Sequence, residues 1–351
     1  MAGIRVGLIG CGRISDLHAR AYGEIEGAEI YAVCDTDRTL AEAKMKEWGA
    51  CRCFIDYRDM LADPGLDAVE ILTPQDSHEA IALDAVEAGL PTALQKPMTV
   101  DLASADRIVE AVRESSVRFR ITDNYIFYPP VVFAKKLLDN GEIGDPTNIR
   151  IKMISSDAGG WTVPPAAWEW RRAEALKGRG MQTYDHGHHL WAAARYLLGE
   201  SEKVVAWIDS IDGSIDSPAV IMWKYCSGVR YGMCEYVHAR DAVIPSNYYA
   251  NDEWFEISGT KGVICINRCT GHLKEGPVVS VFSGSSWKHY DDIPSDWYQG
   301  FRGAAENFVS LVRGETVPML SAEEGRAVLE FALAVGTSAR EGREVRLGGG
   351  V

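Results

Sequence analysis

Two glycines at the end of an apolar segment give the first indication of chemistry in this 351-residue sequence. The run V-G-L-I-G-C-G-R-I-S places Gly10 and Gly12 between a predicted strand and a predicted helix, and the third small position is Ser15. Gly10 allows a tight turn and Gly12 lets the backbone approach a pyrophosphate. The first turn of the helix then offers N–H groups to the phosphates. The spacing predicts a dinucleotide site in this loop, which also contains Arg13 and Ile14.

An acidic residue ends the next predicted strand, Glu29 to Asp35, and lies 25 residues after Gly10. This is close to the spacing at which a carboxylate binds the adenosine ribose hydroxyls. Asp35 and Asp37, on either side of Thr36, place two negative charges where the 2′-phosphate of NADP would lie. We therefore expect Asp35 and Thr36 to contact NAD rather than NADP. The alternative is that Asp35 only caps the following helix.

Polar residues follow two later strands of the same series. The segment T-P-Q-D-S-H follows the predicted strand Ala68 to Thr73, and Q-K-P follows the strand Thr92 to Gln95. Ligands bind at the carboxyl ends of strands in doubly wound parallel sheets. We expect further cofactor contacts from these two loops, at Thr73, Pro74, His78 and Gln95. Lys96 taken alone would more often be a solvated loop residue.

A predicted helix near Thr183 to Leu198 carries an acid and a base on one face. Asp185 and His189 are four residues apart, a spacing that also occurs in simple helical ion pairs. His186 and His188 lie beside them and raise the possibility of a metal. Neighbouring helical residues point apart, and no further cysteine or carboxylate nearby completes a ligand set. We expect no metal site, and we assign His186 and His188 to pocket lining or packing.

These motifs, together with the turn G-E-I-G at residues 141–144, resemble the Gfo/Idh/MocA family of oxidoreductases nearly end to end. The resemblance implies an N-terminal Rossmann domain and a C-terminal α/β domain whose open sheet commonly makes dimer or tetramer contacts. It also implies NAD(P)-dependent oxidation or reduction of sugars, cyclitols and their derivatives. The E-K-P lysine of the family corresponds to Lys96, and its D-x-x-x-H pair corresponds to Asp185 and His189.

The resemblance gives these three residues catalytic roles. When a secondary alcohol is oxidised, a proton leaves oxygen while a hydride leaves carbon for nicotinamide C4. A base and a positive charge must therefore face that oxygen. We expect His189 to be the general base and Lys96 to be its electrostatic partner and the alternate acid or base. Asp185 is expected to orient the substrate hydroxyl or the imidazole.

The sequence departs from the family pattern at four positions. Gln95 replaces the glutamate of E-K-P, which removes a negative charge beside Lys96 and should make the ammonium easier to deprotonate. Ala192 replaces an acidic residue often found three positions after the catalytic histidine. Gln182 and Tyr184 stand where small or apolar residues are common. These changes leave the fold and the cofactor as predicted, but they leave the substrate open.

Aromatic and basic residues precede the catalytic helix, in a stretch that lines the pocket in the family. Aromatic faces suit the C–H faces of a sugar ring, so Trp168 is a candidate for substrate contact. Arg171 is another candidate: it could bind a carboxylate, a hydroxyl or a cofactor phosphate, or it could form a structural ion pair. Tyr125 is a third, although aromatic residues at a domain junction more often belong to the core. Lys96, Asp185 and His189 are also expected to touch the substrate.

The elements that must position these residues form two series. Up to residue 123 short β-branched strands alternate with helices, which predicts an NAD-binding Rossmann domain with a doubly wound parallel sheet. From residue 124 to 351 strands follow one another with few helices. This pattern predicts an α+β domain with a large, mainly antiparallel open sheet for substrate binding and oligomerisation. The fold class is therefore α/β.

Composition narrows the possible partners. The net charge is −14 and no basic cluster stands out, so duplex nucleic acid and anionic membranes are poor partners. The eight cysteines form no C-x-x-C pair, and without a signal peptide or an apolar span we expect them reduced, in the cytoplasm. The favoured function is an NAD-dependent sugar or cyclitol dehydrogenase or reductase that forms a homodimer or homotetramer. Two alternatives are an enzyme that retains NAD for elimination or epimerisation, and a non-catalytic NAD-binding regulator.

Overall fold

The chain forms two compact units in the computed structural model, which describes residues 3–163, 165–211, 213 and 215–348. Unit 1 comprises Met1–Asn124 and Gly300–Leu329, and unit 2 comprises Tyr125–Gln299 and Glu330–Val351. The units are thus discontinuous, whereas the sequence pattern predicted one boundary near residue 123. Gly300–Leu329 belongs to unit 1, to which it is hydrogen-bonded: the N–H of Ile121 donates to the carbonyl of Leu320 over 2.8 Å.

Unit 1 contains a six-stranded parallel sheet in the order β3-β2-β1-β4-β5-β6, as predicted for a Rossmann domain. The strands are β1 (Ile4–Ile9), β2 (Ala28–Cys34), β3 (Arg52–Phe54), β4 (Ala68–Ile71), β5 (Thr92–Gln95) and β6 (Phe119–Thr122). All residues of β4, β5 and β6 are buried, as expected of strands covered on both faces. The strand order reverses between β1 and β4, so the loops that follow these strands lie at the switch point where ligands bind.

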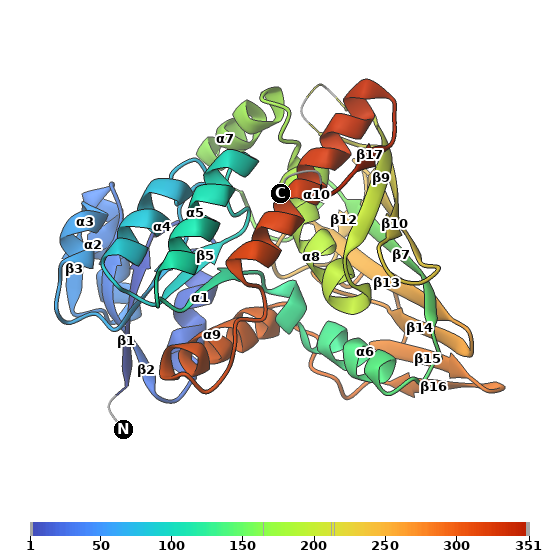
Figure 1. The fold of residues 1–351 in the computed structure, drawn as a ribbon, viewed down its shortest axis with the longest axis horizontal. Coiled ribbons are helices and arrows are strands. Elements are labelled where there is room, and N and C mark those ends of the chain that lie inside the picture. The colour runs from blue at the N-terminus through green and yellow to red at the C-terminus, as the bar shows by residue number, and fades with distance from the viewer. Residues whose placement is uncertain (1–2, 164, 212, 214, 349–351) are drawn as a thin grey trace. The chain divides into compact units, whose positions relative to one another are not determined.

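The helices of unit 1 surround this sheet (Figure 1). They are α1 (Ser15–Glu24), α2 (Arg38–Trp48), α3 (Tyr57–Leu61), α4 (His78–Glu87), α5 (Leu102–Glu114), α9 (Tyr298–Arg313) and the first part of α10 (Ala322–Glu341). Helix α9 carries Phe301, whose ring meets His18 of α1 edge to face with centroids 5.1 Å apart. The sequence pattern predicted β2, β4 and β5 within an alternation of strands and helices that runs up to residue 123.

Unit 2 is built on a nine-stranded sheet in the order β16-β15-β14-β13-β7-β11-β10-β9-β17. The strands are β7 (Pro146–Ser155), β9 (Ser201–Ile208), β10 (Ala219–Tyr225), β11 (Tyr231–His238), β13 (Asn251–Gly259), β14 (Gly262–Ile266), β15 (Val279–Ser283), β16 (Ser286–Tyr290) and β17 (Val345–Arg346). Only the β7 and β11 pair is parallel. The prediction of a mainly antiparallel sheet is confirmed.

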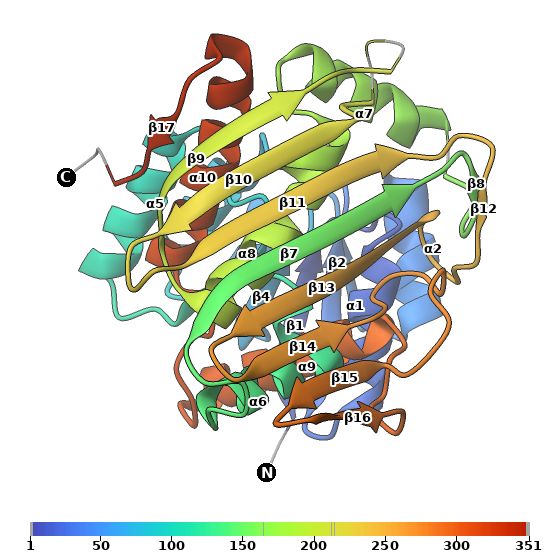
Figure 2. The ribbon, with the colours of Figure 1, turned by 90° about the vertical axis from the view of Figure 1, so that its right-hand side faces the viewer.

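One face of the large sheet carries the helices of unit 2, and Figure 2 shows the other face, which is open. The remaining elements are η1 (Tyr125–Phe127), α6 (Pro129–Asp139), α7 (Pro165–Leu176), η2 (Met181–His186), α8 (Gly187–Leu198) and the two-stranded sheet of β8 (Ala158–Gly159) and β12 (Val243–Ile244). Trp191 of α8 contacts Trp223 and Tyr236 of the sheet, with ring centroids 5.8 and 6.2 Å apart. This aromatic layer fixes α8 on the sheet. Helix α7 was not predicted.

Two further findings concern the described residues only. None of their helices is both long enough and apolar enough to cross a membrane. All eight cysteines are free thiols; four are buried, namely Cys11, Cys34, Cys234 and Cys269.

Candidate active site

The glycine loop after β1 is shaped by its neighbours. Gly10 has φ +100°, and a Cβ there would come 2.8 Å from the backbone carbon of Leu72, so only glycine fits. Around Gly12, by contrast, no described atom beyond its two chain neighbours lies within 4 Å of the place of a Cβ. The Ser15 hydroxyl donates to the Gly10 carbonyl over 2.8 Å. The loop therefore has open space where a pyrophosphate would approach the start of α1, which Arg13 and Ile14 precede.

Asp35 and Asp37 have different tasks. The Asp35 carboxylate accepts hydrogen bonds from the backbone N–H of Cys11 (2.8 Å) and of Asp37 (3.0 Å). Asp37 caps α2 by accepting from the N–H groups of Thr39 and Leu40. The cap considered for Asp35 is thus supplied by Asp37. Asp35 instead ties the glycine loop to the end of β2, which leaves its carboxylate beside the loop that would hold the cofactor.

His78 joins the loops that follow β4 and β5. Its Nε2 lies 2.7 Å from the Thr73 carbonyl, and its Nδ1 lies 2.9 Å from the Pro97 carbonyl. Burial lowers the pKa of His78 below its ordinary value, although these carbonyls act in the other direction. The ring is 1% exposed, so it holds the two loops in place. Its predicted contact with the cofactor stays a prediction, as do those of Thr73 and Pro74.

Lys96 follows β5 and is half-buried. Its backbone N–H donates to Oε1 of Gln95 over 2.8 Å. The Gln95 amide nitrogen lies 3.2 Å from Nε2 of His18, and the side chain is 9% exposed. Gln95 is therefore turned into unit 1, where its side chain shapes the backbone at Lys96.

In unit 2, Asp185 and His189 lie where a π-helical segment continues into an α-helix. Asp185 is in η2, and its N–H donates to the Gly180 carbonyl over 3.0 Å, five residues back. His189 is in the first turn of α8 and is 8% exposed. Asp216, which sequence analysis missed, accepts from the N–H groups of Gln182 and Thr183, each over 2.7 Å. Short π-helical segments often occur at functional sites.

His189 stacks on the ring of Tyr125, with centroids 4.5 Å apart and an interplanar angle of 16°. The Tyr125 hydroxyl donates to Glu253 over 3.1 Å and lies 2.9 Å from the Thr270 hydroxyl. Tyr125 is fully buried. The tyrosine is thus fixed at both ends, and it fixes the plane of the imidazole.

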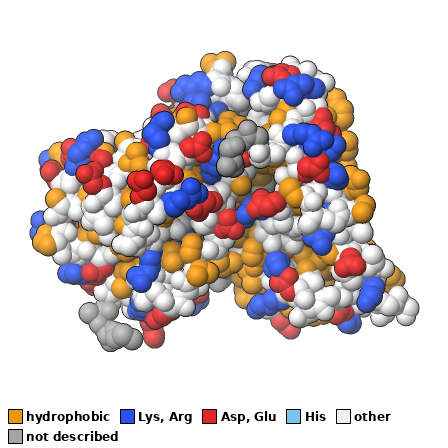
Figure 3. Space-filling view, in the orientation of Figure 1, with side chains coloured by type: hydrophobic (Ala, Val, Ile, Leu, Met, Phe, Trp, Pro, Cys, Tyr) orange, Lys and Arg blue, Asp and Glu red, His pale blue; other side chains and the backbone are white. Residues whose placement is uncertain are grey.

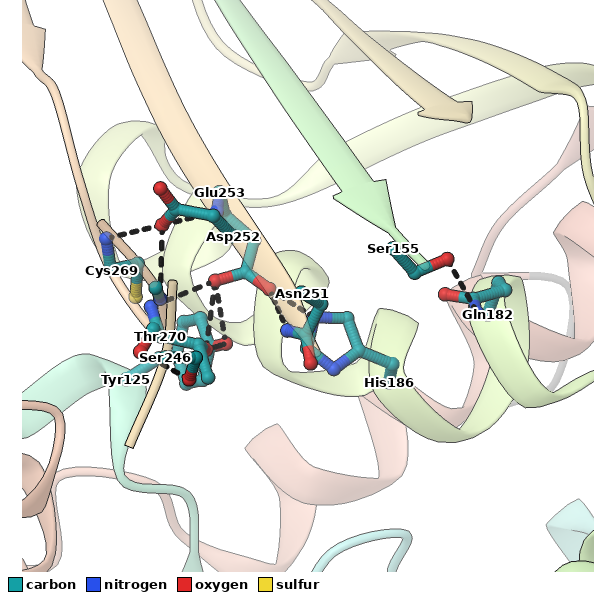
Figure 4. Close-up of polar contacts among 11 residues, drawn as sticks. Tyr125, Ser155, Gln182, His186, Ser246, Asn251, Asp252, Glu253, Cys269 and Thr270 are labelled. Atoms are coloured by element: carbon teal, nitrogen blue, oxygen red, sulfur yellow. Dashed lines mark hydrogen bonds and ion pairs between the residues drawn. The ribbon is translucent and has the colours of Figure 1, made fainter. Parts of the chain in front are cut away.

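Glu253 is the centre of this cluster, and it was not predicted (Figure 4). The carboxylate is completely buried and accepts from the Thr270 hydroxyl (2.9 Å) and from Asn251. His186 Nε2 lies 2.8 Å from its Oε1. Burial raises the pKa of Glu253, but His186 and the hydrogen bonds outweigh burial and keep it below the ordinary value. His186 is therefore the partner of a buried carboxylate.

Aromatic rings gather near this cluster in unit 2. Trp297 contacts Tyr125, Tyr248 and Tyr249, with centroid distances of 6.5, 5.2 and 6.1 Å. The Arg171 guanidinium lies over the rings of Trp168 and Tyr249, at 5.7 and 5.3 Å. Of the alternatives for Arg171, a structural ion pair is not found among the described residues. The sequence had indicated Trp168, but Tyr248, Tyr249 and Trp297 come from distant segments.

Comparison with known proteins identifies the family. Residues 4–122 match the profile of an oxidoreductase family with an NAD-binding Rossmann fold, and residues 131–265 match the C-terminal domain of the same family. The chain belongs to the Gfo/Idh/MocA family of oxidoreductases. Unit 1 of this Gfo/Idh/MocA protein therefore contains an NAD-binding Rossmann domain, and NAD is its cofactor, as predicted.

Two curated relatives of this Gfo/Idh/MocA chain match nearly end to end. It is 28% identical to scyllo-inositol 2-dehydrogenase (NAD(+)) of Bacillus subtilis, over 98% of this chain and 96% of that protein. It is 27% identical to D-apiose dehydrogenase of Paraburkholderia graminis, over 97% of this chain and 88% of that protein. The chain is thus an oxidoreductase whose relatives oxidise cyclitols and sugars.

Solved structures share the fold. An oxidoreductase from Agrobacterium radiobacter in complex with NAD+, L-tartaric acid and magnesium has a TM-score of 0.85 at 21% identity, and the match covers 100% of both chains. A levoglucosan dehydrogenase in complex with NADH has a TM-score of 0.80 at 22% identity, and the match covers 98% of this chain and 99% of that one. At these identities the likeness supports the fold alone.

Proposed function

We propose that this protein is an NAD-dependent dehydrogenase that transfers a hydride between nicotinamide and a secondary hydroxyl or ketone of a sugar, glycoside or cyclitol. The observation that carries this proposal is the imidazole of His189, held flat against Tyr125, whose hydroxyl is anchored to the buried Glu253. An imidazole in a fixed plane suits proton transfer to one defined oxygen. The aromatic rings of the same unit suit the apolar face of a sugar ring.

Each catalytic candidate has one task in the proposed reaction. His189 accepts the proton of the substrate hydroxyl, and Asp185 orients that hydroxyl or the imidazole. The Lys96 ammonium stabilises the negative charge that develops on the oxygen, or exchanges a proton with it. Bound NAD would supply the hydride acceptor of this reaction, C4 of its nicotinamide ring. Gly10, Gly12 and Asp35 fit this cofactor, because the loop is open at Gly12 and a carboxylate stands at the end of β2.

Cofactor turnover with a panel of polyols tests the proposal. The purified protein is incubated with NAD+ together with one compound at a time from a set of inositols, aldoses, aldonic acids and glycosides. The absorbance of NADH is recorded. The proposal predicts NADH in amounts that exceed the enzyme with at least one secondary alcohol. An enzyme that retains NAD for epimerisation or elimination would change the substrate without net NADH. Tight NAD binding with neither result would indicate a regulator.

We also propose that the protein is a homodimer or homotetramer that associates through the open face of the large sheet. This face exposes Trp207, Val220, Met222 and Tyr231, with exposed fractions of 59, 36, 39 and 49%. Trp207 lies opposite Val220 across the β9 and β10 pair, so these side chains form one patch. Hydrophobic side chains line the right-hand edge of Figure 3, where the edge of this sheet lies. Apolar patches of this kind mark association surfaces.

The cytoplasmic location stays a prediction. The eight free thiols fit a reducing compartment.

A further inference from the structure

A chain of buried polar side chains crosses the interior of unit 1 and ends at the backbone of Lys96. It runs from Glu70 on β4 through His18 on α1 to Gln95 on β5, and their exposed fractions are 1, 3 and 9%. Glu70 Oε1 lies 3.2 Å from His18 Nδ1, and His18 Nε2 lies 3.2 Å from Gln95 Nε2. Buried polar groups cost free energy unless they are hydrogen-bonded. The cost of burying these three polar side chains in unit 1 must therefore be offset by their hydrogen bonds.

The backbone N–H of Lys96 determines the direction of each hydrogen bond in this series of side chains. An N–H can only donate, so the Gln95 atom 2.8 Å from Lys96 N must be the amide oxygen. The other terminal atom of Gln95 is then the NH2 group, which also only donates. It follows that Nε2 of His18 accepts through its lone pair and carries no proton. A neutral His18 must keep its proton on Nδ1, where it donates to Glu70.

Two groups besides His18 act on the carboxylate of Glu70. Thr122 donates its hydroxyl to Glu70 Oε1 over 3.1 Å, and the buried Arg120 acts on Glu70 through its positive charge. Arg120 itself donates to Asn307 of α9 over 3.2 Å. Burial raises the pKa of Glu70, whereas the hydrogen bond from His18 and the positive charge of Arg120 lower it.

Two more groups complete this environment. Tyr22 of α1 is buried beside Glu70, and burial and that negative charge raise the pKa of its hydroxyl, so Tyr22 stays neutral. The ring of Phe301 meets the ring of His18 edge to face, with ring centroids 5.1 Å apart. With a neutral His18, Glu70 and Arg120 are the charged side chains among these residues, and their charges are of opposite sign.

We propose that His18 and Glu70 are positioning residues for Lys96, acting through Gln95, and that Gln95 keeps His18 in the neutral tautomer protonated at Nδ1. The proposal rests on the proposed catalytic role of Lys96. It gives a reason for glutamine at position 95. A glutamate there would offer only acceptors, so His18 would need a second proton and a positive charge. With Gln95, all hydrogen bonds from Glu70 to the Lys96 backbone form while the imidazole is neutral. The Lys96 backbone is then held without a second proton on His18.

Nitrogen NMR of histidine-labelled full-length protein tests the tautomer, with no need for a substrate. The signals of His18 are assigned by their absence from the His18→Gln variant. We expect a wild-type spectrum at neutral pH with a protonated Nδ1 and an unprotonated Nε2. In Gln95→Glu, both nitrogens of His18 should be protonated. A wild-type His18 that is protonated at Nε2, or at both nitrogens, overturns the proposal.

Activity variants test the positioning role. A glutamine at position 18 still offers one acceptor and one donor, whereas leucine offers neither. We expect His18→Gln to retain turnover and His18→Leu to lower kcat about 10-fold to 100-fold, because small displacements of a catalytic group have effects of this size. NAD affinity should hold in both variants. The control is His289→Leu, which removes an exposed histidine of β16 and should change nothing.

The two proposals fail in different ways. If His18→Leu keeps full kcat while Lys96→Ala is inactive, the positioning role is refuted and the catalytic role of Lys96 stands. If Lys96→Ala keeps full activity, the proposed catalytic mechanism fails, and the NMR result still decides the tautomer. If His18→Leu unfolds, Gln95→Glu replaces it in the comparison: double protonation of His18 in this variant should be accompanied by a lower kcat, and an unchanged kcat refutes the positioning role.

Discussion

Asp216 should stabilise the segment that carries Asp185 and His189. Its carboxylate accepts three hydrogen bonds at the start of η2, from the N–H of Gln182, the N–H of Thr183 and the hydroxyl of Thr183. The fit is close, since a Cβ at Gly180 would come 2.2 Å from the carboxylate. Asp216→Ala removes all three acceptors and leaves the first N–H groups of the segment without a partner.

The magnitude follows from these contacts. A hydrogen bond to a charged group contributes about 1.5–3 kcal/mol, so three would contribute roughly 5–9 kcal/mol before the cost of burying the charge. That cost is substantial, because burial raises the pKa of Asp216 although the bonds from Thr183 and Gln182 lower it. Measured losses of helix caps are about 0.5–2 kcal/mol. We expect a net loss of about 2–3 kcal/mol, which lowers Tm by roughly 4–12 °C.

Urea unfolding and thermal unfolding of Asp216→Ala measure this loss, with Asp209→Ala as the control. Asp209 is exposed and makes no side-chain hydrogen bond among the described residues, so its replacement should change stability by less than about 0.5 kcal/mol. Below the midpoint of unfolding, kcat of Asp216→Ala should fall about tenfold, since Asp185 and His189 lie within the next two turns. If the two variants are equally stable, the carboxylate does not hold η2 and the reasoning is wrong.

Three further predictions concern other parts of the chain. Asp35→Ser should weaken NAD binding and reduce the preference over NADP in calorimetric titrations, and an unchanged preference would reject the role of Asp35. Burial and the charge of Glu253 raise the pKa of Asp252 to about 6, so its contribution to stability is complete below about pH 4 and declines by roughly 3 kcal/mol as the pH rises to 6. In Asp252→Asn, the free energy of unfolding should depend less steeply on pH between pH 4 and pH 6. A pH dependence equal to that of the wild type would contradict the raised pKa of Asp252. Trp207→Glu should lower the oligomer mass in sedimentation, unlike Val317→Glu in unit 1; equal masses would exclude the open face as the interface.

The Rossmann half was predictable because its signals are local. The strand before Gly10 and the acidic end of β2 are short patterns in which spacing alone sets the geometry. The membership of helix α9 in unit 1 could not be predicted, because its partners such as Arg118 are almost two hundred residues away in the sequence. Amphipathic periodicity shows that a helix has a buried face, but it does not identify what covers that face.

The site in unit 2 was only partly predictable. The spacing of Asp185 and His189 indicated a shared helix face, but the π-helical geometry of η2 depends on Asp216, which comes from another segment. Glu253 was missed because β13 begins with the polar residues Asn251, Asp252 and Glu253, which do not show the apolar pattern of a buried strand. Their carboxylates are satisfied by N–H groups of residues 269–273, and no local pattern encodes that pairing.

Lys96→Ala provides the most direct test of the proposed mechanism. The measurement is kcat for NADH formation with the substrate found in the polyol panel, together with the dissociation constant of NAD. The loop after β5 keeps its backbone contacts in this variant, because Gln95 binds the N–H of residue 96 and not its side chain. We predict that turnover falls by orders of magnitude while NAD affinity is retained. Turnover near the wild-type value would contradict the central role of Lys96 in the chemistry.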